Sequence, residues 1–261
     1  DDPVRKWLGD SFSLGPHPYV SSVLTVRDLL SHRTGLAEAQ GDFGGYVWKT
    51  DEYVRRLGKL DPVHTLRERM EYSNTGWVVA GQVLASAANA SSWCAALKAV
   101  LLEPLHLRAT FCQRNELGDG DDPHLAAVHK CDPCSGAARG AAVAREAPPP
   151  VATYRFVATG GAADFAWGAA DPAGSVLSSV RDMSRVLQLL LGVTSTPLLA
   201  PSVLEEMLTG QMVTPRSWQA ECGVAGWSGS AARTSGHTAA VGLGFDLVME
   251  LELVGRRVAY A

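Results

Sequence analysis

The feature that most restricts the fold is a change of hydrophobic period near the end of the chain. From Phe245 to Leu253 every second residue is apolar, and three of the four residues between them carry a carboxylate. This two-residue period is that of a β-strand with one face on a core. Val254-Gly255-Arg256 can turn the chain into a second strand over 257–261. We expect an antiparallel hairpin packed against the helix expected after Ser179.

The segments upstream of the hairpin show helix signals instead. Thr25 to Asp28 and Ser179 to Asp182 are Thr/Ser-x-x-Asp patterns, in which a hydroxyl and a carboxylate satisfy free amides of the first helical turn. Residues 50–60, 75–90 and 92–103 are further expected helices, with 75–90 buried on most sides. Apolar residues at helical spacing follow Ser179: Val180, Met183, Val186, Leu187, Leu190 and Leu191. Helices first and a hairpin last predict an α+β fold.

At 261 residues the chain is long enough for one large domain or two small ones. The chain is 46% hydrophobic, enough for a proper core. Residues 118–150 are rich in Gly, Ala, Pro and Asp without a hydrophobic period, so we expect a long low-complexity insertion or loop there.

Charge and hydropathy exclude several classes of partner. The net charge is −4, with 23 basic and 27 acidic residues mixed along the sequence, so no footprint for nucleic acid is visible. The longest apolar runs, such as Val186 to Val193, fall short of the ~20 residues of a membrane helix. A small neutral or weakly charged substrate fits better. No secretory signal opens the chain, but Asp1 to Leu8 already resemble the inside of a domain, so localisation stays open.

Five cysteines are an odd number and do not predict a disulfide framework. Cys131 and Cys134, with His124 and His129 upstream, are the pair with metal-like or redox-like spacing. We expect no metal ion there, because a closed zinc site needs four ligands. A local disulfide between Cys131 and Cys134 stays open. We expect no cofactor elsewhere in the chain.

Tyr72-Ser73-Asn74 places a phenol and a carboxamide two residues apart before an expected helix. If the segment is extended, Tyr72 and Asn74 point the same way and Ser73 points the opposite way, an arrangement that suits a cleft wall. The alternative is a helix entry, in which Ser73 or Asn74 caps a helix that begins at Thr75 or Gly76.

In their order, these segments resemble the serine beta-lactamase and penicillin-binding-protein superfamily, in particular the branch with class C enzymes, D-aminopeptidases and esterases. Tyr72-Ser73-Asn74 corresponds to the second catalytic motif of that family. The resemblance implies a beta-lactamase/transpeptidase-like fold, an antiparallel sheet packed against helices with a helical subdomain. It also implies that residues 1–261 form a single domain of this family, in partial form. It also makes Tyr72 a site residue rather than a cap. The other similar segments are Asp1 to Val4, Thr25 to Leu36, Pro104 to Phe111, Ala173 to Asp182 and Gly242 to Phe245.

Two motifs of the family do not occur where the resemblance expects them. The family acylates the serine of a Ser-x-x-Lys motif, whose lysine lies one helical turn from the hydroxyl. None of the five lysines follows a serine by three positions. The His-x-Gly or Lys-Thr-Gly strand should come just after Ala261, and His237-Thr238-Ala239 is a poor stand-in because it lacks the glycine. Leu66-Arg67 also stands where Pro-Gly is usual. We expect the sheet to be incomplete in this chain, with an exposed edge.

The resemblance implies roles for both site residues. Tyr72 would relay the proton from nucleophile to leaving group, and Asn74 would hold the amide carbonyl of the substrate and orient the lysine. The function expected is a serine hydrolase that cleaves a small-molecule amide or ester through an acyl-serine intermediate in the complete protein, with this chain inactive by itself.

The alternative is a non-catalytic pseudoenzyme that uses the fold for binding or scaffolding. Intact Tyr72 and Asn74 favour the enzyme, and the missing Ser-x-x-Lys favours the pseudoenzyme. A zinc or redox role for Cys131 and Cys134 is a third hypothesis. The sequence does not choose among a beta-lactam, a peptide and an ester, because loops set that choice, and it leaves the oligomeric state open.

Overall fold

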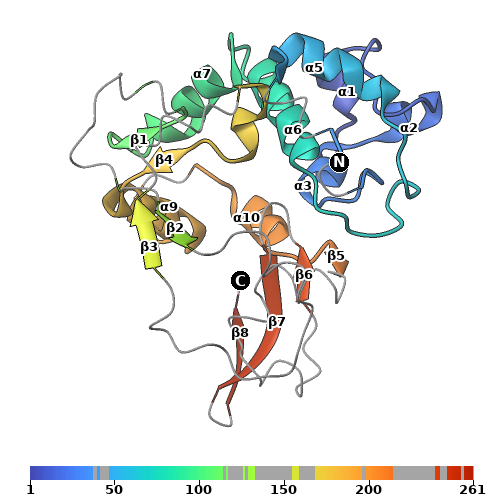
Figure 1. The fold of residues 1–261 in the computed structure, drawn as a ribbon. Helices are drawn as coiled ribbons and strands as arrows, with labels where there is room; N and C mark the ends of the chain where they lie inside the picture. The colour runs from blue at the N-terminus through green and yellow to red at the C-terminus, as the bar shows by residue number, and fades with distance from the viewer. Residues whose placement is uncertain are drawn as a thin grey trace.

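The fold is described from a computed structural model, in which helices fill the N-terminal half and an antiparallel sheet lies near the C-terminus (Figure 1). The structure describes residues 1–37, 40–41, 47–113, 116, 126, 129–132, 155–158, 168–195, 198–213, 239–241, 246–253 and 256–260. Within these ranges, no helix is both long and apolar enough to cross a bilayer.

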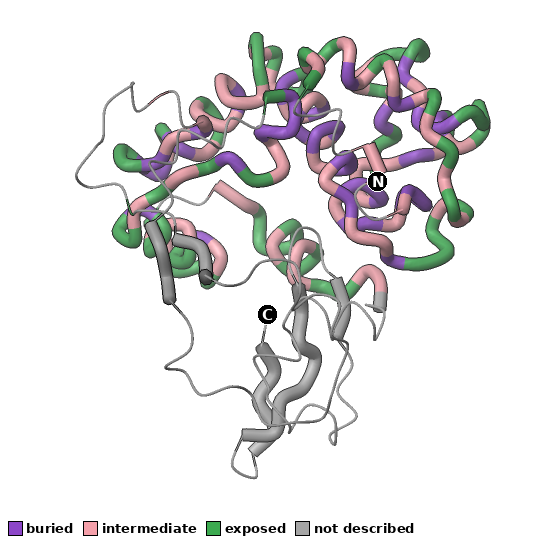
Figure 2. The backbone as a smooth tube through the Cα atoms, viewed as in Figure 1, coloured by how far each residue is buried: buried purple, intermediate pink, exposed green. Residues whose placement is uncertain are grey.

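The N-terminal body surrounds one long helix, α6 (Asn74–Ala87). Buried residues of this helix, among them Val78, Val79 and Val83, share a core with Leu29 and Tyr53. Figure 2 shows buried positions of the chain gathered in this N-terminal body. The predicted helix at 75–90 is therefore confirmed, with its burial. The elements around it are α1 (Val4–Leu8), α2 (Pro18–Val23), α3 (Val26–Leu30), α5 (Thr50–Arg56) and the 3₁₀ turn η1 (Leu57–Lys59).

Two glycines let other segments approach α6 closely. A Cβ at Gly76 would lie 3.0 Å from the carbonyl oxygen of Leu29 in α3. A Cβ at Gly81 would lie 2.6 Å from the side chain of Pro172, which belongs to the 3₁₀ helix η6 (Gly168–Ala173). Both contacts need a residue without a side chain, so these positions fix how α3 and η6 pack on α6.

A second hydrophobic cluster forms beside this body. Leu102, Leu105, Leu107, Cys112 and Leu189 are its buried members. It joins α7 (Trp93–Leu97), the π-helical turn η2 (Lys98–Leu102) and α9 (Val180–Leu190). Its member Cys112 directly follows β1 (Thr110–Phe111), which forms a short antiparallel ladder with β4 (Leu177–Ser178). Helix α10 (Pro201–Met207) follows.

Helix α9 is confirmed, but its apolar residues divide between two faces. Leu189 is buried in the second cluster and Val186 packs against it. Val180, Leu187 and Leu191 are exposed, at 89%, 56% and 73% of their surface. Helical spacing therefore predicted the helix without identifying its buried residues.

The four-stranded sheet has the order β5-β6-β7-β8 and is antiparallel throughout. Its last two strands, β7 (Asp246–Leu253) and β8 (Arg256–Tyr260), are the predicted hairpin. The register shifts between Val248 and Leu251, so strict alternation does not run through the whole pair. Phe245 lies outside the described residues, and the side chains of β7 are not described either. The packing of the hairpin against α9 therefore stays a prediction. The first two strands are β5 (Met212–Val213) and β6 (Ala239–Val241).

The cysteines differ from the expectation in one respect. Cys94 and Cys112 form a disulfide that ties α7 to the residue after β1. Cys131 lies in β2 (His129–Asp132), a strand within the expected insertion at 118–150. This strand pairs with β3 (Arg155–Ala158), which follows the insertion. Cys134 and His124 lie outside the described residues, so the absence of a metal at that pair stays a prediction.

Candidate active site

Tyr72 and Asn74 lie side by side at the N-terminal end of α6. The Tyr72 phenol donates a hydrogen bond to Oδ1 of Asn74 at 3.2 Å. Both residues are half-buried, whereas Ser73 between them is buried. This is the alternation expected of an extended approach to a helix. The structure thus brings the two predicted site residues together on one side of the chain.

The helix-cap interpretation of this motif is wrong. Helix α6 begins at Asn74, so Ser73 is the N-cap residue, with extended dihedral angles of φ −149° and ψ 113°. Among the described residues, no side chain caps the first turn, and the buried Ser73 hydroxyl has no hydrogen-bond partner. Burial of Ser73 follows from its opposite orientation to Tyr72 and Asn74, which turns the hydroxyl away from the free amides of the helix.

His32 contacts both Tyr72 and Ser73 of the motif. Its Nδ1 accepts the backbone N–H of Ser73 at 3.1 Å, and its ring packs against the Tyr72 ring with centroids 4.9 Å apart. The indole N–H of Trp77 faces Nε2 at 3.3 Å. A neutral imidazole can accept one of these two donors, and an imidazolium can accept neither. Burial lowers the pKa of His32 to about 4, so the ring is neutral at neutral pH.

A buried carboxylate fixes the loop that leads to the motif. Asp28 completes the predicted capping box of α3 with Thr25. It also accepts Arg33 Nε at 2.6 Å, and Arg67 donates to both of its oxygens, at 3.0 Å and 2.9 Å. Burial raises the pKa of the Asp28 carboxyl, but the hydrogen bonds from Arg67, Thr25 and Arg33 outweigh burial and hold the pKa below its usual value.

Arg67 explains how this chain tolerates its departure from the Pro-Gly pattern. Its φ is 68°, in the left-handed region that glycine adopts without strain. The backbone N–H of Arg67 donates to the Arg33 carbonyl at 2.9 Å, and that of Glu71 donates to the His32 carbonyl at 2.9 Å. Arg67 is exposed, but its guanidinium pairs with buried Asp28 and so anchors the approach to Tyr72.

A family model described as Beta-lactamase matches residues 1–248. The chain belongs to the beta-lactamase family. The match covers α3, α6 and the Tyr72-Ser73-Asn74 motif, which are the segments that carried the resemblance in the sequence.

Solved structures share the fold of this beta-lactamase-family chain. A D-stereospecific amidohydrolase from Streptomyces sp. superposes with a TM-score of 0.61 at 22% identity, over 95% of this chain and 63% of that one. An octameric penicillin-binding protein homologue from Pyrococcus abyssi gives a TM-score of 0.60 at 21% identity, over 98% of this chain and 49% of that one. The chain therefore spans about half to two thirds of the length of these proteins. Likeness at this identity shows the fold alone.

One curated relative is closer in sequence over a shorter stretch. The unguisins hydrolase ungD' of Aspergillus campestris is 30% identical over a segment that makes up 31% of this chain and 16% of that protein. The relative is a hydrolase, in line with the family.

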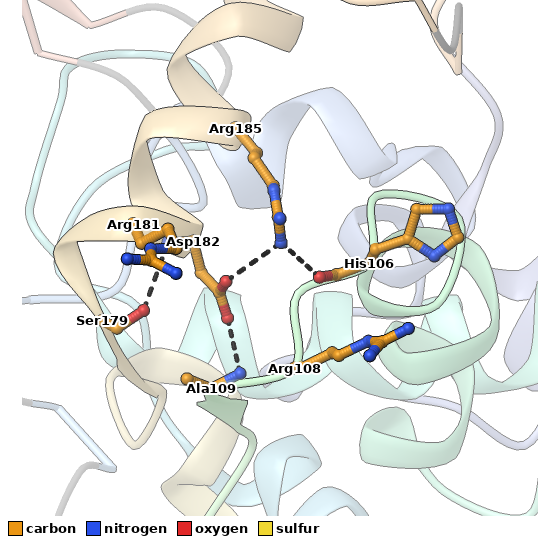
Figure 3. A pocket seen from close by; sticks show the side chains of 7 residues that line it. All are labelled: His106, Arg108, Ala109, Ser179, Arg181, Asp182 and Arg185. Atoms are coloured by element: carbon orange, nitrogen blue, oxygen red, sulfur yellow. Dashed lines mark hydrogen bonds and ion pairs between the residues drawn. The ribbon is translucent and has the colours of Figure 1, made fainter.

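One cavity among the described residues does not include the motif. Its volume is about 670 Å³. A second cavity, of about 370 Å³, adjoins it through His106 and Arg108. Neither is lined by Tyr72 or Asn74. The lining of the larger cavity is His106, Arg108, Ala109, Ser179, Arg181, Asp182 and Arg185 (Figure 3).

Asp182, which lines the larger cavity, connects α9 to the segment that enters β1. Its carboxylate accepts the Ala109 N–H at 2.7 Å and the Thr110 hydroxyl at 2.9 Å, and Arg185 pairs with it at 3.4 Å. Ser179 caps α9 as predicted, by accepting the Asp182 N–H. The carboxylate is thus used to hold α9 on the segment before β1. The guanidinium groups of Arg108 and Arg181 point to opposite sides in Figure 3, so the lining does not converge on a ligand.

Sequence reasoning missed the residues that support the motif, above all His32. His32 lies in the most recognisable stretch, Thr25 to Leu36, but 41 positions before Ser73, and only the packing of α3 on α6 brings them together. Among the described residues, one group of potential metal ligands has its ligand atoms within 4.8 Å of one another: Cys94, Cys112 and Glu116. The disulfide occupies both sulfur atoms of this group.

Proposed function

We propose that Tyr72 and Asn74 belong to the active site of a serine hydrolase that cleaves a small-molecule amide or ester through an acyl-serine intermediate. The observation that carries the proposal is the hydrogen bond of the Tyr72 phenol to Asn74 at the start of α6, in a chain of the beta-lactamase family. An amidohydrolase and a D-amino acid amidase among the structural neighbours support an amide bond as the target.

The two side chains supply different parts of acyl transfer. A phenol beside the nucleophile can take the serine proton and pass it to the leaving group. The carboxamide of Asn74 has an NH₂ group, which is the kind of donor that binds the carbonyl oxygen of an acyl group, and its Oδ1 accepts the phenol. His32 packs under the Tyr72 ring and holds its orientation. Positioning of this kind supports catalysis by keeping reacting groups aligned.

We propose that the 261-residue chain does not form the acyl-enzyme by itself. No lysine in it follows a serine by three positions. Members of a catalytic unit act together, so Tyr72 and Asn74 contribute little without a nucleophile. A longer chain that includes a Ser-x-x-Lys would form the intermediate.

Covalent labelling tests the proposal directly. The chain and a version extended along its reading frame are incubated with a fluorescent penicillin and with a p-nitrophenyl ester, and the mass of each protein is measured. We expect an adduct on the extended chain alone, on the serine of its Ser-x-x-Lys. An extended chain that has the motif but takes up neither reagent favours the pseudoenzyme.

Matched tyrosine variants test the role of Tyr72 in the extended chain. Tyr72→Phe should slow acylation by about 10²-fold or more, the range of a general acid–base group. The control is Tyr19→Phe, because Tyr19 is 74% exposed on α2. Equal rates in both variants would remove Tyr72 from the mechanism.

A further inference from the structure

The turn between α6 and α7 carries an acceptor motif that the hydrolase site does not use. Residues 89–91 read Asn-Ala-Ser, an Asn-x-Ser/Thr sequence without proline at the middle position. The chain has three asparagines, and the other two, Asn74 and Asn115, are followed by Thr-Gly and Glu-Leu. Asn89 is therefore the one asparagine that meets the rule for N-linked glycosylation.

The turn presents Asn89 to solvent. Asn89 adopts φ 49°, and its backbone N–H donates to Ser86 at 3.1 Å while that of Ala90 donates to Ala85 at 2.9 Å, which closes the C-terminus of α6. These bonds use the backbone and not the side chain. Both Asn89 and Ser91 are exposed, and within the described residues neither side chain has a hydrogen-bond partner.

A second, independent feature indicates that the chain is made in an oxidising compartment, where N-linked glycans are also added. The disulfide between Cys94 and Cys112 begins five residues after Asn89. Disulfides persist in oxidising surroundings, such as the lumen of the secretory pathway and the outside of the cell, and are rare in the cytosol. N-linked glycans are added in that same lumen, so an exposed acceptor and a disulfide fit one route of synthesis.

We propose that Asn89 is modified by an N-linked oligosaccharide in an oxidising secretory compartment. The co-substrate is an oligosaccharide bound through pyrophosphate to a membrane lipid. The Nδ2 atom of Asn89 forms a bond to C1 of the first sugar as the bond between C1 and the pyrophosphate oxygen breaks. The amide loses one proton, and the lipid pyrophosphate leaves with the bonding electron pair.

The position leaves the proposed active site accessible. Asn89 follows the C-terminal end of α6, and Asn74 begins that helix. A helix of 14 residues is about 20 Å long, so a glycan at Asn89 lies at the far end of α6 from Tyr72 and Asn74. Modification and hydrolysis are thus compatible.

The first experiment tests whether Asn89 can accept a glycan. The full chain is directed into the secretory pathway of a host that carries out N-glycosylation, and whole-cell lysates are treated with peptide:N-glycosidase, so that a poorly folding variant is still scored. We expect one glycan on the wild-type chain and on Ser91→Thr, and none on Asn89→Gln or Ser91→Ala. The control, Ser92→Ala, changes the neighbouring serine outside the motif and should keep the glycan.

The second experiment tests the natural protein. Protein isolated from the cells that make it is digested, and the peptide that contains Asn89 is identified by mass spectrometry, together with the oxidation state of Cys94 and Cys112. A glycan on Asn89 with an intact disulfide supports the proposal. An unmodified Asn89 in this material, or a glycan that persists in Asn89→Gln in the first experiment, overturns it.

Discussion

The backbone N–H of Ser73 donates to Nδ1 of His32 at 3.1 Å, and this bond links the stretch after α3 to the entry of α6. The bond requires an unprotonated Nδ1. Because His32 is buried and its ring packs against Tyr72, protonation of His32 would place a positive charge next to the candidate site.

His32 should make the free energy of unfolding decrease as the pH falls from 6.5 to about 4. Its pKa is about 4 in the folded protein and 6.5 in the unfolded chain, so between these values the unfolded state binds a proton that the folded state does not. The contribution is complete above pH 6.5 and declines as the pH falls toward about 4. The shift corresponds to about 3 kcal/mol at most.

Urea unfolding across that window measures the effect. The free energy of unfolding of the wild type minus that of His32→Gln should decrease steadily as the pH falls from about 6.5 to about 4. The Asp28 carboxyl does not contribute there, because its pKa lies below 3.8 and its stabilisation is lost only at lower pH. A pH-independent difference would show that His32 titrates normally in the folded chain.

Arg67 should stabilise the fold through its guanidinium and destabilise it through its backbone. Arg67→Ala keeps a left-handed residue but removes two hydrogen bonds from buried Asp28, so we expect a loss of about 1–3 kcal/mol. Arg67→Gly removes the same bonds but relieves the strain at φ 68°, so it should be less destabilising than alanine by about 1 kcal/mol.

Chemical denaturation of these two variants, compared with Arg55→Ala, separates the contribution of the Arg67 guanidinium from that of its backbone strain. Arg55 makes an exposed ion pair with Glu52 on α5, and its removal should change stability by less than about 0.5 kcal/mol. If Arg67→Ala behaves like Arg55→Ala, the ion pair with Asp28 is not an anchor of the loop.

Ser73 should tolerate alanine despite its place inside the motif. In the part of the chain that the structure describes, its buried hydroxyl has no hydrogen-bond partner, so removing it should be neutral or stabilise the fold by up to about 1 kcal/mol. Ser92 provides the contrast, because its hydroxyl accepts the Ala95 N–H at 3.1 Å and caps α7. Ser92→Ala should cost about 1 kcal/mol. Thermal unfolding of both variants is the measurement, and a loss at Ser73 as large as at Ser92 would restore the cap interpretation.

These residues show which parts of the molecule local sequence patterns can predict. Thr25 and Ser179 cap their helices as expected, because capping depends on residues three positions apart. The alternation from Phe245 to Leu253 predicted the hairpin, because the two-residue period of a strand is also a local pattern. The resemblance to the family supplied Tyr72 and Asn74, and the structure placed them in contact without testing their roles.

The rest depended on contacts between distant segments. His32 meets Ser73, and Arg67 meets Asp28, across 41 and 39 positions. No local period encodes such pairs. The same holds for the buried face of α9, since Val180 and Leu189 are equally apolar in the sequence but Val180 is 89% exposed and Leu189 is 5% exposed.

The disulfide between Cys94 and Cys112 should stabilise the second cluster measurably. It closes a loop with a sequence separation of 18, and a cross-link of that length contributes about 3 kcal/mol by restricting the unfolded chain. We expect a reducing agent to lower the free energy of unfolding of the wild type by about that amount. Tryptophan fluorescence, to which Trp93 of the same cluster contributes, is the measurement. The double variant Cys94→Ala with Cys112→Ala is the control: it should be less stable from the start and insensitive to reductant. If the double variant keeps the full response, the effect arises from Cys131, Cys134 or Cys222, and the bridge between α7 and β1 carries none of it.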